Sequence, residues 1–234
     1  MKKIRYSLVL PCFNEGPTFE ASLKKIIDQV GGGLWEIIFV EDHSSDDTKK
    51  VVEKFAKHKK NAKIIIHKHN LGRGRSVRDG ILASSGEICG YIDADCEISP
   101  SYIPIFIKEI EKGADLAIGK RFYEGGFKSI SRVVASKAYA QMIKLFLDLP
   151  VDDTEAGYKF FKKSTILPVL KNTKNPHWFW DTEICARAYK AGLKISQVPV
   201  LFIRRPEKKS TVRLFADSVK YIDSLVKFRR DFKN

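Results

Sequence analysis

Short apolar runs alternate with longer amphipathic segments in the first half of the chain, and this alternation limits the possible folds most strongly. The apolar runs are rich in Val, Ile and Leu, as expected for strands buried on both faces of a parallel sheet. The expected strands are residues 4–10, 36–40, 63–67, 87–92 and 116–118, and the expected helices are 18–30, 46–58, 76–84 and 101–111. Repeated strand and helix units predict an α/β fold with a mostly parallel, doubly wound sheet and flanking helices.

The residues that follow four of these strands are polar and largely acidic. The four loops are 11–15 (PCFNE), 41–47 (EDHSSDD), 70–74 (NLGRG) and 93–97 (DADCE). Since ligands of doubly wound sheets bind beyond the carboxyl ends of the strands, we expect the four loops to line one crevice. Helix capping explains Ser45 and Asp46 taken singly, but it does not explain four such loops together.

Three carboxylates alternate in the loop after the fourth strand, at Asp93, Asp95 and Glu97. Crowded carboxylates repel one another unless a cation lies between them. Hard oxygen ligands favour Mg²⁺ or Mn²⁺, and such an ion commonly joins protein carboxylates to a nucleotide diphosphate. The sequence therefore predicts a metal site formed by Asp93, Asp95 and Glu97, in preference to a solvated turn.

Two other nucleotide-binding patterns fit poorly. Residues 72–74 (GRG) follow a strand and open a helix, but Val77 stands where a dinucleotide-binding loop has its third small residue. The chain contains no Gly-x-x-x-x-Gly-Lys-Ser/Thr loop. The dinucleotide and P-loop interpretations are therefore weak.

Taken together, the loops resemble those of family 2 glycosyltransferases of the GT-A fold, and especially of the dolichol-phosphate mannose and glucose synthases. The similar segments are SLVLPCFNEG, VEDHSSDDT, NLGRGRSVRDG, YIDADCEISP, DDTEAGYKFFKK and WFWDTEICARAYKAGLKISQVPV. They follow the family's order from Ser7 to Val212. Glu97 and Glu155 stand where the family commonly has Gln, His43 replaces a Gly, and Thr211 replaces a Lys.

The resemblance implies an inverting transfer of a hexose from a nucleoside-diphosphate sugar, of the GDP-mannose or UDP-glucose type, to polyprenyl or dolichyl phosphate. The metal, Mg²⁺ or Mn²⁺, would neutralise the leaving diphosphate. The residues implied for the nucleotide are Pro11, Phe13, Glu15, Asp42 and Asp93, and those implied for catalysis and the acceptor are Asp95, Arg121, Arg132, Ser136, Asp153 and Arg205.

The charge of the chain is divided unevenly between its two halves. The whole chain has 42 Lys and Arg against 28 Asp and Glu, a net charge of +14, and residues 120–234 carry +13 of it. A phosphate monoester acceptor has a second pKa of about 6, so at neutral pH it needs cations for positioning more than it needs a general base. The resemblance assigns this phosphate to Arg121, Arg132, Ser136 and Arg205, with Arg204 as a competitor for the last role.

Two other functions fit parts of the sequence. A family 2 enzyme with a sugar hydroxyl as acceptor would use Asp153 as the base, although Asp153 also fits a donor-sugar contact or a structural role. Asp181 and Glu183 similarly fit sugar orientation or helix capping. A basic nucleic-acid-binding protein is the other alternative, but the acidic crevice repels phosphate and no nucleic-acid-binding motif is present. We therefore expect no nucleic-acid partner.

The expected organisation is a GT-A domain over residues 1–211, with a nucleotide-binding half (1–119) and an acceptor half (120–211), followed by a basic amphipathic helix over 212–234. In that helix Val212, Phe215, Val219, Ile222 and Val226 recur at helical spacing. Such a helix packs on its own domain or lies on an anionic membrane surface.

No apolar run approaches the roughly 18 residues of a membrane-spanning helix. The apolar run near the start is too short for a signal peptide, and the four cysteines lack metal-ligand or paired spacing. We therefore expect a reduced cytoplasmic protein, associated peripherally with the cytosolic face of a membrane, where a membrane protein is a further possible partner.

Overall fold

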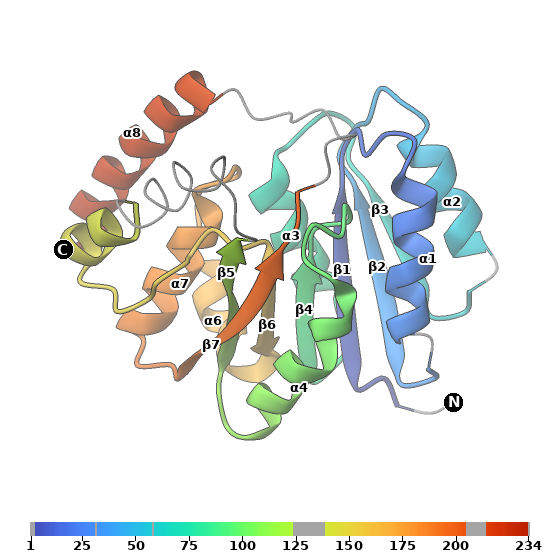
Figure 1. The fold of residues 1–234 in the computed structure, drawn as a ribbon, viewed down its shortest axis with the longest axis horizontal. Coiled ribbons are helices and arrows are strands. Elements are labelled where there is room, and N and C mark those ends of the chain that lie inside the picture. Colours follow the sequence, from blue (N-terminus) through green and yellow to red (C-terminus); the bar gives the residue numbers. More distant parts are fainter. Residues whose placement is uncertain (1–2, 31, 58, 124–138, 205–213, 234) are drawn as a thin grey trace.

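The computed structural model describes residues 3–30, 32–57, 59–123, 139–204 and 214–233. Within these residues, one seven-stranded sheet has the order β3-β2-β1-β4-β6-β5-β7 (Figure 1). Its strands are β1 (Tyr6–Cys12), β2 (Trp35–Glu41), β3 (Ala62–Ile66), β4 (Ile88–Ile92), β5 (Leu116–Tyr123), β6 (Tyr158–Lys162) and β7 (Ile195–Phe202). Strand β6 is antiparallel to both neighbours, and the other neighbouring strands are parallel. The prediction of a mostly parallel, doubly wound α/β fold is confirmed.

Helices cover both faces of the sheet because successive strand residues point to opposite sides. Leu8 and Leu10 of β1 join one buried core, and Val9 between them joins the other. The first core includes side chains of α1 and α4, and the second includes side chains of α3, α6, α7 and α8. The helices are α1 (Phe19–Val30), α2 (Thr48–Lys57), α3 (Arg73–Ala83), α4 (Ile103–Glu111), α6 (Lys163–Lys171), α7 (Trp180–Lys190) and α8 (Leu214–Lys233), with a 3-10 turn, η1 (Pro100–Tyr102).

Helix α3 begins at Arg73, three residues before the predicted start. Gly72 has φ of +97°, and its carbonyl accepts the first helical hydrogen bond from Ser76 N (3.0 Å). A Cβ atom on Gly74 would lie 2.4 Å from Cβ of Trp180. The glycines at 72 and 74 therefore allow the first turn of α3 to approach α7 closely, rather than forming an extended turn before the helix.

Strand β5 is also longer than predicted. It pairs in parallel with β7 over its whole length, from Leu116 opposite Ile195 to Tyr123 opposite Phe202. It therefore runs across position 119, where the sequence suggested a change from one half to the other. Polar residues near the end of β5 concealed its full length, because only the first four residues of the strand are fully buried.

The C-terminal helix α8 packs on its own domain. Leu225 and Phe228 are buried, and the Phe228 ring lies 5.4 Å from that of Phe179. The Tyr221 hydroxyl also lies 2.5 Å from Oγ1 of Thr182 on α7. These contacts leave the predicted stripe facing outward at Ile222 and Val226, which are 51% and 36% exposed.

Val212 lies outside the described residues. Across the part of the chain that the structure describes, no helix is both long enough and apolar enough to cross a membrane.

Candidate active site

The four polar loops meet at the carboxyl ends of the strands. The loop after β1 contacts the loop after β2 through two hydrogen bonds. Ser45 N donates to Asn14 Oδ1 (2.8 Å), and Gly16 N donates to Asp46 (3.0 Å). Asp42 joins the loop after β2 to Gly72 in the loop after β3, and Arg73 joins that loop to Asp93 in the loop after β4. The expected single crevice is therefore formed by a continuous series of hydrogen bonds between loops.

Asp42 is the buried centre of the second and third loops. Its carboxylate accepts hydrogen bonds from Leu71 N and Gly72 N, both at 2.8 Å, and lies 2.7 Å from Nδ1 of His67. Only 2% of the residue is exposed. These bonds fix the backbone that leads into α3, so Asp42 shapes this part of the crevice.

The other residues implied for the nucleotide lie on the first loop. Pro11 is buried in β1 opposite Val40, and Phe13 and Glu15 are partly exposed beyond the end of the strand. Glu15 N donates to Thr48 Oγ1 (2.9 Å), which ties this loop to the start of α2. The three residues thus lie at the edge of the sheet where a nucleotide is expected to bind.

A network of buried charges underlies the crevice. Arg73 donates to Asp93 Oδ1 from both Nε (2.9 Å) and Nη2 (2.7 Å), and to Asp181 from Nη1. Asp181 also accepts from Lys159 Nζ (2.6 Å) and from the Tyr91 hydroxyl. Two cations and two carboxylates therefore balance, which is the arrangement that makes buried charge tolerable.

The charges of this network favour the ionised forms of Asp181 and Arg73. Burial would raise the pKa of Asp181, but Arg73 and Lys159 outweigh it and lower that pKa. Burial would likewise lower the pKa of Arg73, but Asp181 and Asp93 raise it. The sequence interpretation missed Arg73 and Lys159. A lysine inside the apolar strand YKFFK was the available signal, since buried lysines require a partner.

The metal prediction rests on the loop after β4. Asp93 N donates to Gly157 O (3.0 Å), and Asp95 Oδ1 accepts from Glu97 N (3.1 Å). Partial burial raises the pKa of Asp93; Arg73 opposes the shift, and the nearby Asp95 carboxylate adds to it. A divalent cation would relieve this repulsion, so the oxygen donors fit Mg²⁺ or Mn²⁺.

Among the described residues, no group of three His, Cys, Asp or Glu side chains is arranged to hold a metal ion by itself. Such a group is unnecessary when substrate phosphates supply ligands, because one or two carboxylates then suffice. Asp93 already accepts two hydrogen bonds from Arg73 through Oδ1. The three-carboxylate site stays a prediction.

Arg121 and Asp153 form a bidentate ion pair on the acceptor side. Nε of Arg121 lies 2.7 Å from Asp153 Oδ2, and Nη2 lies 2.9 Å from Oδ1. The backbone N of Arg121 donates to the same carboxylate (3.1 Å). Among the described residues, the remaining guanidinium nitrogen, Nη1, has no hydrogen-bond partner.

Glu155 lies beside this pair, with Oε2 3.9 Å from Nη2 of Arg121. Partial burial raises the pKa of Glu155 to about 7, although Arg121 opposes the shift. Asp153 and Asp181 add to the increase. Glu155 is thus a carboxyl group that changes charge near neutral pH inside the crevice.

Neither carboxylate of the Asp-x-Glu segment caps a helix. Asp181 belongs to the buried network, and Glu183 accepts from Asn175 N (2.8 Å) and from Arg187 Nε (2.8 Å). The capping interpretation of Asp181 was wrong because α7 begins at Trp180, with no side-chain cap on its first turn.

Three residues implied for the acceptor, Arg132, Ser136 and Arg205, lie outside the described residues. Arg204, the last described residue after β7, is exposed, and Ile203 N beside it donates to Glu97 O (2.8 Å). The end of β7 therefore lies next to the loop proposed to hold metal.

Comparison with known proteins gives the family. The sequence profile of Glycosyl transferase family 2 matches residues 7–166. Glycosyltransferase AglD of Haloferax volcanii is 27% identical over 204 residues, which cover 84% of this chain and 33% of AglD. Dolichyl-phosphate beta-glucosyltransferase ALG5A of Trichomonas vaginalis is 30% identical over 211 residues, covering 83% of this chain and 64% of that protein. The chain thus spans between a third and two thirds of these two relatives.

A third relative, the dolichyl-phosphate beta-glucosyltransferase of Saccharomyces cerevisiae, is 28% identical over 252 residues, covering 97% of this chain and 75% of the yeast protein. Glucosyl-3-phosphoglycerate synthase of Mycobacterium tuberculosis, solved with UDP, superposes with a TM-score of 0.72 at 22% identity. The match covers 97% of this chain and 80% of that one and confirms the GT-A fold. The same synthase has been solved with Mn²⁺, UDP and glucosyl-3-phosphoglycerate. By its loops, its sheet and these relatives, the chain belongs to glycosyl transferase family 2.

Proposed function

We propose that this glycosyltransferase transfers a hexose, with inversion, from a nucleoside-diphosphate sugar to a polyprenyl or dolichyl phosphate. Glucose from UDP-glucose is the preferred donor, because two of the relatives are named dolichyl-phosphate beta-glucosyltransferases. GDP-mannose, which the sequence alone left equally open, is the second choice. The bidentate pair of Arg121 and Asp153 is the observation that carries the choice of acceptor.

The pair of Arg121 and Asp153 favours a phosphate acceptor over a hydroxyl acceptor. A hydroxyl acceptor needs a general base, and Asp153 was the candidate. Both oxygens of Asp153 accept hydrogen bonds from Arg121, so the carboxylate is poorly placed to take a proton. A phosphate monoester needs no base, because near pH 7 it is already largely an oxyanion. The remaining edge of Arg121 suits such a phosphate, since guanidinium groups bind phosphate oxygens in a planar fork.

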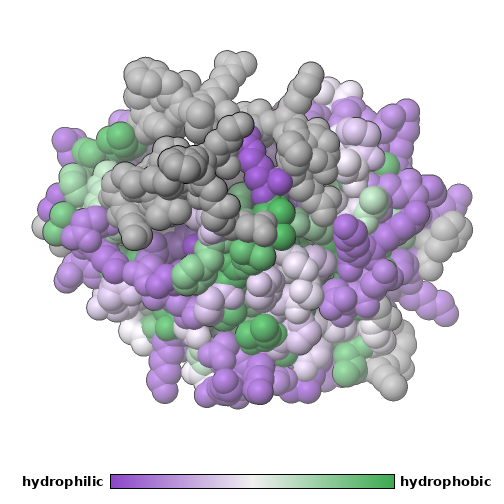
Figure 2. Space-filling view, viewed as in Figure 1, coloured by the Kyte–Doolittle hydropathy of each residue, from purple (hydrophilic) through white to green (hydrophobic). Residues whose placement is uncertain are grey.

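Exposed apolar side chains near the ends of β5 and β7 suit an acceptor that carries a hydrocarbon chain. Phe122 and Leu201 are opposite each other on β5 and β7 and are 51% and 39% exposed. Ile203, just after β7, is 52% exposed. Figure 2 shows hydrophobic side chains over the region of β5 and β7. Phe122 and Leu201 lie on the face of the sheet opposite to that of the Arg121 side chain, because successive strand residues alternate, so this surface offers apolar contact near the end of β7 but not directly beside the acceptor phosphate.

In the proposed reaction, an acceptor phosphate oxygen attacks the anomeric carbon while the bond to the nucleoside diphosphate breaks on the opposite face. A divalent ion, when bound, supplies charge neutralisation for the leaving diphosphate. Asp95 and Glu97 would hold that ion, and Arg73 keeps Asp93 oriented beside them. Arg121 and Arg204 would orient the acceptor phosphate from the other side of the crevice.

A lipid acceptor would place the enzyme at an anionic membrane surface, on the cytosolic face. Ile222 and Val226 are exposed on α8, and Lys220 and Arg230 on the same helix are exposed as well.

Removing α8 would expose Leu225 and Phe228, so the Ile222→Ser and Val226→Ser double variant is the cleaner test. It should float less with anionic liposomes than wild type, and Leu82→Ser, at another exposed apolar site, should float normally. Equal flotation of all three would contradict membrane docking by α8.

The proposed function is tested in two steps. A thermal-shift series with UDP-glucose, UDP-N-acetylglucosamine and GDP-mannose, each with Mn²⁺ or Mg²⁺, should identify the donor by the largest increase in Tm. Hexose transfer from that donor to polyprenyl phosphate should then be detected by chromatography of the lipid product. Transfer to a sugar hydroxyl but not to the lipid phosphate would support the alternative acceptor instead.

A further inference from the structure

Trp178 is a large aromatic residue left exposed beside the buried charge network. The chain has three tryptophans, and the structure describes all of them. Trp180 is fully buried and Trp35 is partly buried at the start of β2, but Trp178 is 42% exposed. Its neighbours Phe179 and Trp180 both belong to the core. Core packing therefore does not account for Trp178.

The indole of Trp178 lies against Arg73. Cζ of Arg73 is 5.0 Å from the centroid of the Trp178 ring and 5.4 Å from that of the Tyr91 ring. The same guanidinium donates two hydrogen bonds to Asp93, at the end of β4. Trp178 contacts Arg73, and Arg73 binds Asp93, so Trp178 lies close to the carboxylate that is expected beside the donor diphosphate.

The backbone around Trp178 is held firmly. Arg75 N donates to Pro176 O (3.0 Å), and His177 N donates to Asn175 Oδ1 (2.9 Å). Asp181 N donates to Trp178 O (3.2 Å). The ring is thus positioned by the packing of α3 against the start of α7 before any ligand arrives, which lowers the entropic cost of using it as a binding surface.

We infer that Trp178 is the surface on which the hexose ring of the donor rests. This inference rests on the proposed function. A hexose presents a face of C–H groups that packs well on an aromatic ring, and an indole has the largest ring surface available to a side chain. The hexose is bonded directly to the diphosphate, so a ring beside Asp93 lies where the sugar, and not the base, is expected. Trp178 would therefore contribute to binding of the sugar but not of the nucleotide.

This division gives a test that does not depend on turnover. Dissociation constants are measured by calorimetry, with Mn²⁺, for UDP-glucose and UDP, and for GDP-mannose and GDP. For the pair that binds, Trp178→Ala should weaken nucleotide-sugar binding about 5- to 10-fold and leave nucleotide binding within about twofold. Trp178→Phe should recover most of the loss, because a smaller aromatic ring remains.

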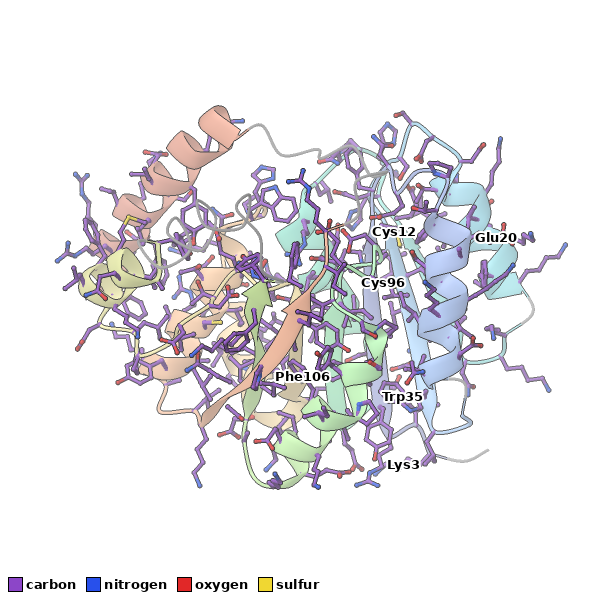
Figure 3. All side chains as sticks on the ribbon, in the orientation of Figure 1. Lys3, Cys12, Glu20, Trp35, Cys96 and Phe106 are labelled. Atoms are coloured by element: carbon purple, nitrogen blue, oxygen red, sulfur yellow. The ribbon has the colours of Figure 1, made fainter. Side chains whose placement is uncertain are left out.

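Intrinsic tryptophan fluorescence supplies a second measurement. In wild type the nucleotide sugar should change the emission more than the free nucleotide does, and this difference should disappear in Trp178→Phe. Trp35→Phe is the matched control and should keep the difference, because Trp35 lies toward the lower end of the sheet, while Cys12 marks the upper end of β1 (Figure 3).

Three outcomes would overturn the inference. Equal weakening of nucleotide and nucleotide-sugar binding in Trp178→Ala would mean that Trp178 acts only by supporting Arg73. Unchanged affinity for both would mean that it contacts neither ligand. If wild type binds no nucleotide and no nucleotide sugar, the proposed function fails, and the role of Trp178 fails with it.

Discussion

The guanidinium of Arg121 and the carboxylate of Asp153 are joined by two side-chain hydrogen bonds of 2.7 and 2.9 Å. The side chains are only 19% and 7% exposed. The pair balances the charge of the buried Asp153 carboxylate and fixes the position of the Arg121 guanidinium. It therefore connects the acceptor side of the site to the stability of the fold.

The pair predicts different results for two substitutions. Asp153→Asn should keep transfer within about tenfold of wild type, since a catalytic base would contribute a factor of about 100 to 10,000. Arg121→Ala should lower the free energy of unfolding by about 3 kcal/mol, because it leaves Asp153 buried without its partner. Urea denaturation and steady-state kinetics measure the two effects. A thousandfold loss of turnover in Asp153→Asn would restore Asp153 as a base.

The buried pair of Lys159 and Asp181 predicts a large effect on stability. Lys159 is completely buried and Asp181 is 2% exposed. Lys159→Met should lower the free energy of unfolding by about 3 to 5 kcal/mol, since Asp181 loses a partner in a site away from water. Lys144→Met is the control, because the Lys144 pair with Asp152 is partly exposed, at 40% and 34%, and should contribute less than about 1 kcal/mol. Similar urea midpoints for the two variants would be inconsistent with the network described.

Gly157 predicts a loss of activity through Asp93. A Cβ atom at this position would lie 1.8 Å from Asp93 Oδ2 and 2.6 Å from Nη2 of Arg73. Gly157→Ala should therefore displace the Asp93 carboxylate and reduce donor binding and turnover at least tenfold. Gly33→Ala is the matched control, since a Cβ atom on Gly33 would meet no other atom within 4 Å. Calorimetric titration with donor would settle the matter, and full donor affinity in Gly157→Ala would count against the site.

Glu155 predicts a pH dependence of stability. The folded protein raises the pKa of Glu155 from 4.5 to about 7, so between these values the folded state binds more protons than the unfolded state. Stability contributed by this group therefore falls as pH rises from about 4.5 to 7. Glu155→Gln removes the effect. More than a third of the side chain is exposed, so solvent screening limits the gain at pH 8 to about 1 kcal/mol.

The measurement for Glu155 is the difference in unfolding free energy between the variant and wild type as a function of pH. The difference should be near zero at pH 4 and should rise to its full value by pH 8. A difference that does not change with pH would show that the charge of Glu155 does not affect folding.

The sequence was most informative where the chain repeats one local pattern. Strands β1, β2 and β4 were located to within a few residues because Leu8, Val9, Ile38 and their neighbours are buried on both faces, which produces continuous apolar runs. The convergence of the four loops followed from the topology of such a sheet. Local pattern failed at α3, whose start depends on a close approach between Gly74 and Trp180 rather than on capping.

The charge network was beyond sequence reasoning for a different reason. Arg73 and Asp181 are 108 positions apart, and neither has a local partner that indicates its role. The pairing of Arg121 with Asp153 was missed in the same way, since each residue was considered separately for the acceptor. Pairs of this kind depend on which loops the fold brings together, and periodicity carries no information about them.

The central claim is that this glycosyltransferase transfers a hexose to a lipid phosphate with the help of the loop after β4. The most direct measurement is transfer of labelled glucose from UDP-glucose, or of mannose from GDP-mannose if that donor binds, to polyprenyl phosphate and to the matching polyprenol, with Mn²⁺. We predict a labelled product with the phosphate only, and its loss in folded Asp95→Ala. Equal labelling of polyprenol, or full turnover of Asp95→Ala, would contradict the account.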